Sequence, residues 1–283
     1  MQTIAKATFG CDPEVFVRDE KRLLSIVGRV GGTKDAPLQI TGLPLGFAVQ
    51  EDNVAVEFCV PPASSAEEFV NNVQRAVAEI QAKYLEKQGL KLAFGVSSEL
   101  FDEDQLQTQA AQTFGCDPDF NVYTMEHNPR PDVGDALGKD GPRLRTAGGH
   151  IHFGWDNPDD EQRQVIIRAA DLVLGTASVF LDPDSRRMML YGKAGACRLK
   201  PYGAEYRTLS NFWLSSEKLM KFIAGEAERT VEFANKFADR LMNDALLART
   251  VERGINQRRV ATLEALRNEF GLPSVKELSA LKG

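Results

Sequence analysis

The sequence contains little of what marks several large classes of protein. Its four cysteines, at positions 11, 59, 116 and 197, form no Cys-x-x-Cys pair, so neither a zinc knuckle nor a dense disulfide framework is indicated. No uninterrupted apolar run approaches the ~18 residues of a membrane span, and the first residues lack the charged and then apolar pattern of a leader peptide. We therefore expect a soluble, cytoplasmic protein with reduced thiols and no membrane partner.

An excess of positive charge is also missing. The chain has 34 lysines and arginines against 40 aspartates and glutamates, which gives a net charge of −6 and a pI near 5.3. Proteins that bind nucleic acid usually carry a basic surface, so we expect no nucleic-acid partner. The glycine-rich segment 28–37, with Thr33 and Lys34, lacks the G-x-x-x-x-G-K-[ST] spacing of a P-loop. It is either a loop that covers a substrate or a hairpin turn with an exposed lysine.

Histidine is scarce, and its placement is informative. The chain has three histidines, and two of them, His150 and His152, lie one residue apart in the segment 143–155. Residues i and i+2 of a β-strand share a face, so both imidazoles would point to one side. Arg143 and Arg145 precede them with the same spacing. Two interpretations remain open: a ligand or metal site, or two histidines paired with carboxylates in a half-buried strand.

Carboxylates interrupt two otherwise apolar strands that the sequence predicts. Asp12 and Glu14 have strand spacing within residues 7–17, and Glu57 lies in the run 54–60 on the opposite face from its large apolar residues. Burying such acids is costly unless a positive group meets them, and a divalent cation is the usual solution. The alternative for Asp12 is a turn, because Asp-Pro often opens one.

Two further segments have open interpretations. The word FGCDP recurs at 114–118, where Asp117, Asp119 and Asn121 alternate, and it is either a second edge of the site or a coincidence of turn chemistry. Residues 127–142 are rich in proline, glycine and aspartate, which is typical of a surface loop, and such a loop can move over a site.

Cations are concentrated near the middle of the second half of the chain, in an otherwise acidic protein. They are Arg186, Arg187, Lys193, Arg198, Lys200 and Arg207. Lys193 lies between Gly192 and Gly195, whose backbone is accessible to a phosphate. Glu205 and Arg207 share a predicted strand face and so offer a carboxylate and a guanidinium side by side. The alternative is a set of surface ion pairs, each of small value.

The remaining pattern is helical. A capping box of Ser65 and Glu68 predicts a helix that continues to about residue 88, and residues 159–181 predict a second one with acids in its first turn. From residue 215 the chain is helical and highly charged, and we interpret these helices as a packing layer and a candidate surface for homo-oligomer formation. The predicted division is a catalytic domain at 1–214 and a C-terminal helical extension at 215–283 packed on it.

The carboxylates, imidazoles and arginines together favour a magnesium nucleotide over zinc. Hard divalent cations take oxygen ligands and accept a single histidine, while arginines neutralise a polyphosphate. We expect ATP and Mg²⁺ or Mn²⁺ as cofactors, with one of the two imidazoles as a metal ligand. The paired Gly148 and Gly149 then provide backbone clearance for that ligand.

Four words, in this order, carry a family resemblance: GCDPE, DNVAVEF, RTAGGHIHFGW and YGKAGACRLKPYGAEYRTLSNFW. They resemble the phage-type carboxylate-amine ligases, or amidoligases, a branch of the superfamily of glutamine synthetase and glutamate-cysteine ligase. The resemblance covers roughly residues 7–213, and the C-terminal helices add nothing to it. It implies an α+β fold in which a curved antiparallel β-sheet holds ATP and metals on its concave face and packs helices on its convex face. A phage-encoded member would act in the host cytoplasm.

The resemblance also implies roles for particular residues. Metal binding falls on Asp12, Glu14, Glu57, His150 and Glu205. Binding of the nucleotide falls on Arg145, His152, Arg187, Lys193, Arg198 and Arg207. The catalytic residues are Glu57, Arg198 and Arg207. Position 12 is aspartate where related enzymes often have glutamate, and the shorter side chain can alter the occupancy of one metal.

The implied reaction forms an amide or peptide bond. A substrate carboxylate attacks the γ-phosphate of ATP to give an acyl phosphate, and an amine then displaces phosphate, so no side-chain nucleophile is needed. The partners are small-molecule or peptide carboxylates and amines, which the sequence does not name. Two competing hypotheses are a metal-nucleotide phosphotransferase of the guanidino-kinase type and a non-catalytic phage structural or binding protein with a relic site.

Overall fold

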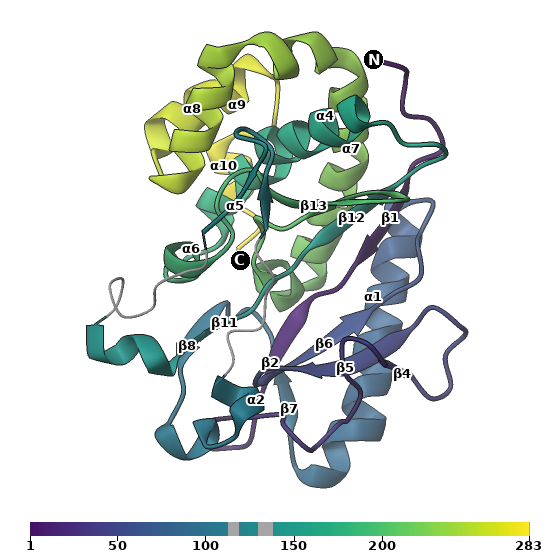
Figure 1. Cartoon of the computed structure of the whole chain (residues 1–283), viewed down its shortest axis with the longest axis vertical. Helices are drawn as coiled ribbons and strands as arrows, with labels where there is room; N and C mark the ends of the chain where they lie inside the picture. Colours follow the sequence, from purple (N-terminus) through teal and green to yellow (C-terminus); the bar gives the residue numbers. More distant parts are fainter. Residues whose placement is uncertain (113–118, 130–137, 283) are drawn as a thin grey trace.

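The protein has an α+β architecture in which one layer of antiparallel strands lies against a layer of helices. The structure, a computed structural model, describes residues 1–112, 119–129 and 138–282. The strands form two six-stranded sheets and a short two-stranded ribbon (Figure 1). The predicted fold class is therefore confirmed.

The first sheet has the strand order β1-β12-β14-β13-β9-β10, and its pairs are antiparallel. Its strands are β1 (Thr8–Cys11), β12 (Ile151–Gly154), β14 (Gly203–Tyr206), β13 (Ala196–Lys200), β9 (Phe120–Asn121) and β10 (Glu126–His127). Ile151 and Phe153 are fully buried on the helix side of β12. The alternation of apolar and polar residues that the sequence shows at 150–153 thus sets which face of the sheet carries the polar groups.

The second sheet has the order β3-β2-β6-β5-β4, with β7 on the free side of β2. Its strands are β2 (Glu14–Arg18), β3 (Leu23–Leu24), β4 (Leu38–Gln39), β5 (Ala48–Asp52), β6 (Ala55–Cys59) and β7 (Lys91–Ala93). Strands β8 (Ser98–Leu100) and β11 (Leu144–Thr146) form the ribbon beside it. Val56 and Phe58 are fully buried, so Glu57 lies on the other face of β6, as the alternation predicts.

The two sheets are joined along one line of backbone. Strand β1 runs into β2 with only Asp12 and Pro13 between them. The amide of Phe58 donates to the Pro13 carbonyl at 3.3 Å, and the amide of Val60 donates to the Cys11 carbonyl at 3.4 Å, so the chain after β6 continues beside β1. The chain therefore keeps its strand direction through Asp12-Pro13 and does not turn there. The hydrogen-bond ladder breaks at Pro13, because proline has no amide to donate.

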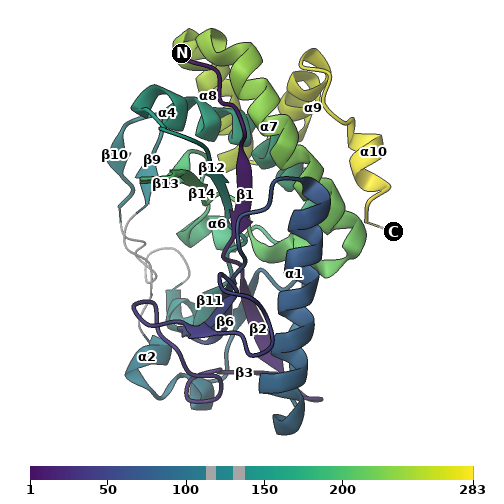
Figure 2. The same ribbon diagram turned by 90° about the vertical axis from the view of Figure 1, so that its right-hand side faces the viewer.

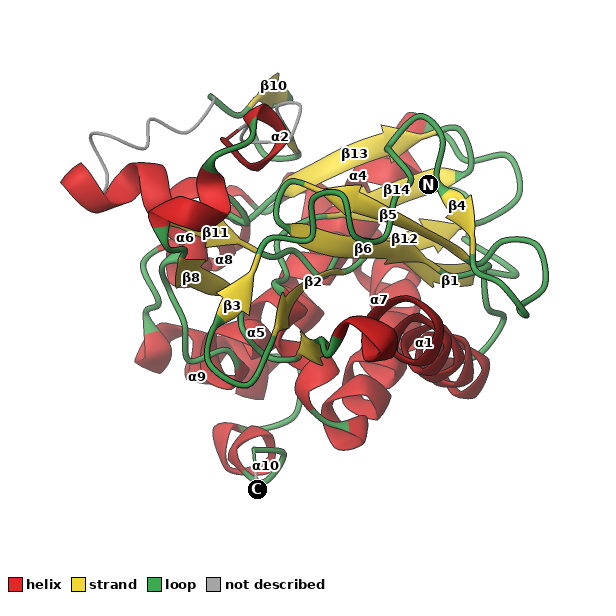
Figure 3. Cartoon of the chain, turned by 90° about the horizontal axis from the view of Figure 1, so that it is seen from below, coloured by secondary structure: helices red, strands yellow, loops and turns green. Residues whose placement is uncertain are grey.

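Helices cover one side of both sheets (Figures 2 and 3). The main ones are α1 (Ala66–Ile80), α4 (Asp160–Ala170), α5 (Thr176–Leu181), α7 (Glu217–Asn243), α8 (Ala245–Asn256), α9 (Val260–Glu269) and α10 (Val275–Ser279), and the short helices are α2 (Gln109–Gln112) and α6 (Arg187–Leu190). Helix α7 packs against both α1 and α4. The C-terminal helices therefore share the core of the sheet-bearing part of the chain.

Both predicted long helices begin where the sequence places their caps, but each contains a π-helical turn. The Ser65 hydroxyl accepts from the Glu68 amide at 3.2 Å, and Asp159 forms a capping box with Gln162. The π turns are Gln81–Leu85 after α1 and Asp171–Gly175 between α4 and α5. The run Asp160–Leu181 is long and apolar enough to cross a membrane, but 78% of its apolar window is buried within the protein, as in a core helix.

Candidate active site

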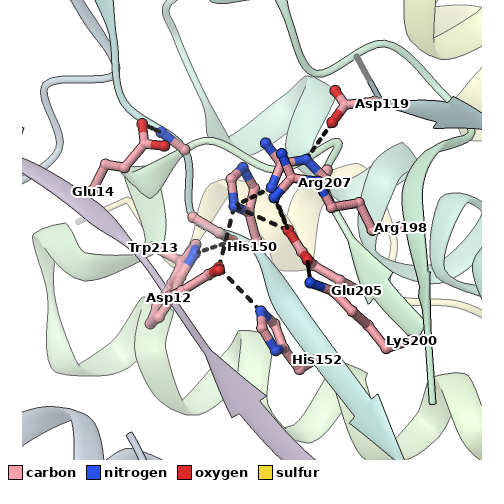
Figure 4. A network of polar contacts seen from close by, with 12 residues as sticks. Asp12, Glu14, Asp119, His150, His152, Arg198, Lys200, Glu205, Arg207 and Trp213 are labelled. Atoms are coloured by element: carbon pink, nitrogen blue, oxygen red, sulfur yellow. Dashed lines mark hydrogen bonds and ion pairs between the residues drawn. The ribbon is translucent and has the colours of Figure 1, made fainter. Parts of the chain in front are cut away.

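Strand register places four residues in a row across the face of the first sheet that the helices leave open. Gly10 lies opposite His152 on β12, His152 lies opposite Glu205 on β14, and Glu205 lies opposite Arg198 on β13. Figure 4 shows that the side chains of this row and of the neighbouring Asp12 converge from three strands. Residues far apart in the sequence thus meet because antiparallel pairing brings same-face positions side by side.

Asp12 binds both imidazoles. One carboxylate oxygen, Oδ1, lies 3.2 Å from His150 Nδ1 and 3.1 Å from His152 Nε2. The predicted shared face of the two histidines is therefore confirmed. Burial raises the pKa of Asp12, but the two histidines outweigh it and hold the pKa well below the ordinary value. Asp12 is a carboxylate, and each imidazole has a fixed anionic neighbour.

Glu205 is fully buried and surrounded by cations. Lys200 Nζ lies 2.9 Å from Oε2, Arg198 Nη1 lies 3.6 Å from Oε1, and Arg207 Nη1 also bonds Oε1. Burial and the charge of Asp12 act to raise the pKa of Glu205. Arg207 and the two histidines outweigh them and lower the pKa to about 2. The carboxylate is held ionised, as a metal ligand must be.

A second acidic cluster, the acid triad, consists of Glu14, Asp52 and Glu57. Glu14 lies opposite Glu57 across the β2–β6 pair, and carboxylate oxygens of all three residues lie within 4.8 Å of one another. Burial and Asp52 raise the pKa of Glu14 to about 7, although the Gly148 amide donates to its Oε2 at 2.7 Å. Burial and then Asp12 raise the pKa of Glu57 well above its usual range. Three acids this close repel one another, which is the arrangement that a bound cation relieves.

Three arginines and two members of the acid triad line one cavity of about 50 Å³. The arginines are Arg145, Arg187 and Arg207, and the acids are Glu14 and Asp52. All three arginines are at most 4% exposed. Burial lowers the pKa of Arg145 to about 10 and also lowers the pKa of Arg187. The cavity therefore has an anionic and a cationic wall.

Backbone carbonyls hold two of these arginines in place. Arg187 donates to the carbonyls of Thr208 at 2.9 Å and of Arg207 at 3.2 Å, and Arg145 donates to the Ala111 carbonyl at 2.7 Å. These bonds to neutral carbonyls hold the two guanidinium groups at the cavity, where their positive charge would attract an anion.

The structure does not bring every predicted cation to this cavity. Arg186 pairs with Asp184 at 3.0 Å, and Arg143 bonds the Phe101 carbonyl and faces Asp102. Lys193 is exposed in the turn before β13 and is not among the residues that line the cavity. These three side chains therefore lie outside the cluster that the described residues form.

Sequence reasoning missed three members of the site. Asp52 completes the acid triad, Asp119 pairs with Arg207, and the Tyr202 hydroxyl lies 2.8 Å from His152 Nδ1. Asp52 lies two residues after Gln50, which pairs with Glu57, so strand register brings it to the triad. Asp119 belongs to the alternating acids after the second FGCDP word, whose residues 114–118 lie outside the described residues, as does 130–137 of the proposed loop.

The expectation for the paired glycines is wrong. A Cβ at Gly148 would overlap the ring of His150, and a Cβ at Gly149 would overlap the Ser210 carbonyl and approach Trp213 Nε1 to 2.5 Å. Trp213 Nε1 instead donates to the Gly149 carbonyl at 3.1 Å. The glycines give clearance to neighbouring parts of the protein rather than to a ligand.

The glycine-rich segment forms a turn supported by Glu51. Four backbone amides, those of residues 28–31, donate to its carboxylate at 2.6 to 2.8 Å. Thr33 pairs with Ala36 across the tip, and Lys34 is exposed. A side chain of the protein therefore occupies the anion-binding amides of this loop.

Fold and site together define an α+β protein whose joined antiparallel sheets carry acids, histidines and arginines on their open face. Residues 142–269 match the family model described as phage phiEco32-like COOH-NH2 ligase type 2. This match agrees with the resemblance to the phage-type carboxylate-amine ligases that the sequence words show, and it supports ligase activity in general. No match was found among curated proteins.

The matched segment differs from the expected one. It includes β12, β14 and the cations between them, but it continues through α7, α8 and α9. The expectation that the C-terminal helices add nothing to the resemblance is therefore wrong. Their packing against α4 and α1 gives the physical reason, because the sheet cannot bury its helix-side face without them.

Proposed function

We propose that the protein is an ATP-dependent carboxylate-amine ligase that forms an amide or peptide bond through an acyl phosphate. One observation carries the proposal: Glu14 and Asp52 line the same cavity as Arg145, Arg187 and Arg207. Phosphoryl transfer from a polyphosphate needs both kinds of residue. The acids hold the divalent cations that bind phosphate oxygens, and the arginines neutralise the rest of the negative charge on the polyphosphate.

Two groups of residues have the donors that Mg²⁺ or Mn²⁺ takes. The acid triad offers three carboxylates, and Asp12, His152 and Glu205 offer ligand atoms that also lie within 4.8 Å of one another. The raised pKa of Glu14 and of Glu57 supports the fit, because burial and the neighbouring acids disfavour negative charges that a divalent cation would stabilise. A divalent cation bound there would neutralise phosphate oxygens and polarise the transferred phosphoryl group.

The two histidines have different surroundings, which suggest different roles. His152 belongs to the second ligand group. His150 also contacts Asp12, but its Nδ1 lies 3.3 Å from Arg207 Nη1. We assign His152 to the metal and His150 to the orientation of Asp12 and Arg207. Burial and Arg207 lower the pKa of His150, which favours the neutral imidazole beside the Asp12 carboxylate.

The remaining cations position phosphate and the developing charge. Arg187 and Arg207 line the cavity, and Arg198 and Lys200 on β13 pair with Glu205, which Arg207 also contacts. A carboxylate substrate placed beside these cations attacks the γ-phosphate, and the cations stabilise the charge that spreads over its oxygens. The amine then displaces phosphate and loses a proton to a nearby carboxylate.

Hydroxylamine trapping tests the proposal. The protein is incubated with ATP, Mg²⁺ and a panel of amino acids, dicarboxylates and peptides, with hydroxylamine as the amine. An acyl phosphate gives a hydroxamate together with ADP, whereas a phosphoguanidine from a guanidino-kinase reaction gives none. If no panel member releases ADP and calorimetry detects no nucleotide binding, the proposal fails and the relic hypothesis replaces it.

A further inference from the structure

A second, larger cavity has His152 among its lining residues. Its volume is about 490 Å³, and its lining is mostly apolar. Cys11, Cys59, Val60, Pro62, Trp155 and Tyr202 contribute side chains to it. A volume of this size suits a small organic group.

Three polar side chains of this lining are already bonded to the protein, whereas the lining residues Lys6 and Asp156 are exposed. The Tyr202 hydroxyl bonds His152 Nδ1 at 2.8 Å, Trp155 Nε1 donates to Gln162 at 2.9 Å, and Thr8 Oγ1 donates to the Gly154 carbonyl at 3.4 Å. A nucleobase would bring several hydrogen-bonding groups to walls where these three side chains are engaged, and unpaired buried polar groups are costly. An apolar group has no such cost.

Two glycines keep this cavity open beside the site. Gly10 and Gly154 both line it, and Gly10 lies directly opposite His152 in the row of the first sheet. A Cβ at Gly10 would meet only the His152 Cβ at 3.7 Å and the Val60 carbonyl at 3.9 Å, which are ordinary contacts. The absence of a side chain there is therefore not required by packing, and any larger side chain would extend into the space.

We propose that this cavity, the apolar cavity, binds an apolar side chain of one of the two substrates of the ligase. The substrate's reacting carboxylate or amine would then lie towards Asp12 and His152, next to the cavity of the arginines. This inference rests on the proposed function and narrows it: at least one substrate carries an aromatic or aliphatic group, and a substrate with a second charge in its place is excluded.

Calorimetric titration and ADP release with four small probes test the proposal. Phenethylamine and 3-phenylpropionate carry an apolar end with an amine or a carboxylate, and putrescine and succinate carry a second charge instead. We expect one phenyl compound to bind, and its charged counterpart to bind at least about tenfold more weakly, because a charge in an apolar pocket is left unsolvated. Which phenyl compound binds identifies the amine or the carboxylate as the apolar substrate.

A variant that fills the apolar cavity with a side chain tests the same proposal. Gly10→Leu should raise KM for the phenyl compound at least about tenfold and leave KM for ATP within about twofold. Gly10→Ala should have a smaller effect in the same direction, and it serves if the leucine variant fails to fold. Gly225→Leu is the matched control, since a Cβ at Gly225 meets nothing within 4 Å and Gly225 lies on α7, outside both cavities.

The outcomes separate the two proposals. If the charged probes are ligated and the phenyl compounds neither bind nor react, the ligase stands and the apolar cavity is refuted. If Gly10→Leu raises KM for ATP instead, the cavity holds the nucleobase and the inference is overturned. If a phenyl compound binds by calorimetry and Gly10→Leu abolishes binding, but nothing releases ADP, the cavity stands and the ligase fails.

Discussion

Asp171 gives a prediction whose magnitude follows from the structure. Its carboxylate is fully buried in the π turn behind the first sheet, where it accepts from the hydroxyls of Tyr206 at 2.7 Å, Tyr123 at 3.0 Å and Thr208 at 3.3 Å. Burial raises the pKa of Asp171 from 3.8 to about 7, against the lowering effect of these hydrogen bonds. Tyr206 and Thr208 alternate with Glu205 and Arg207 along the chain, so Asp171 supports the site from the opposite face of the sheet.

The sign of the effect follows from proton linkage. Between the unfolded and the folded pKa, the folded protein keeps a proton that the unfolded chain loses, so stability falls as pH rises from about 4 to about 7 and is constant above that. Asp171→Asn removes this titration. We expect the free energy of unfolding of the variant, relative to the parent, to rise by roughly 2 to 3 kcal/mol between about pH 5 and about pH 8.

Urea denaturation of both proteins across this pH range measures the difference. Asp239→Asn, on the exposed face of α7, is the control for an aspartate change without burial. Any constant cost of replacing the carboxyl by an amide cancels, since only the slope with pH is compared. Parallel stability curves for Asp171→Asn and its parent would refute the reasoning, because they would show that Asp171 titrates alike in the folded and unfolded states.

The other predictions concern the site and the strand packing. Glu57→Gln should weaken Mn²⁺ binding by at least about tenfold in calorimetry while circular dichroism stays unchanged; equal binding would remove the acid triad as a metal site. Arg207→Ala should lower kcat about 10²- to 10³-fold, whereas Arg186→Ala, outside the cavity, should not; similar losses in both would contradict the site assignment. Gly203→Ala should destabilise by about 2 kcal/mol or more, because its φ is +150° and a Cβ would overlap a neighbouring carbonyl. Gly225→Ala, in open space on α7, should instead stabilise the protein by about 0.5–1 kcal/mol. Thermal melts should therefore show a lower melting temperature for Gly203→Ala and a higher one for Gly225→Ala, and shifts of the same sign would contradict the packing argument.

The sequence by itself determined the local features of the site. Strand alternation predicted that His150 and His152 share a face and that Glu57 faces away from Val56 and Phe58, because the two-residue period of a strand is a property of the backbone. The capping box of Ser65 and Glu68 predicted where α1 begins, since the cap satisfies amides of its own first turn, and the acids of a first helical turn predicted the start of α4. The order of the motif words predicted the family and the fold class.

Only the tertiary structure decided which of these features meet. Pairing of β2 with β6 and of β5 with β6 brings Asp52 to Glu14 and Glu57. The fold also brings Asp119 to Arg207, which is distant in the sequence. Local spacing carries no information about such register, which depends on the packing of whole sheets. For the same reason the sequence grouped Lys193 with the site cations, whereas the fold leaves it exposed. The apolar cavity beside Gly10 was equally invisible, because it is the space between side chains contributed by different strands.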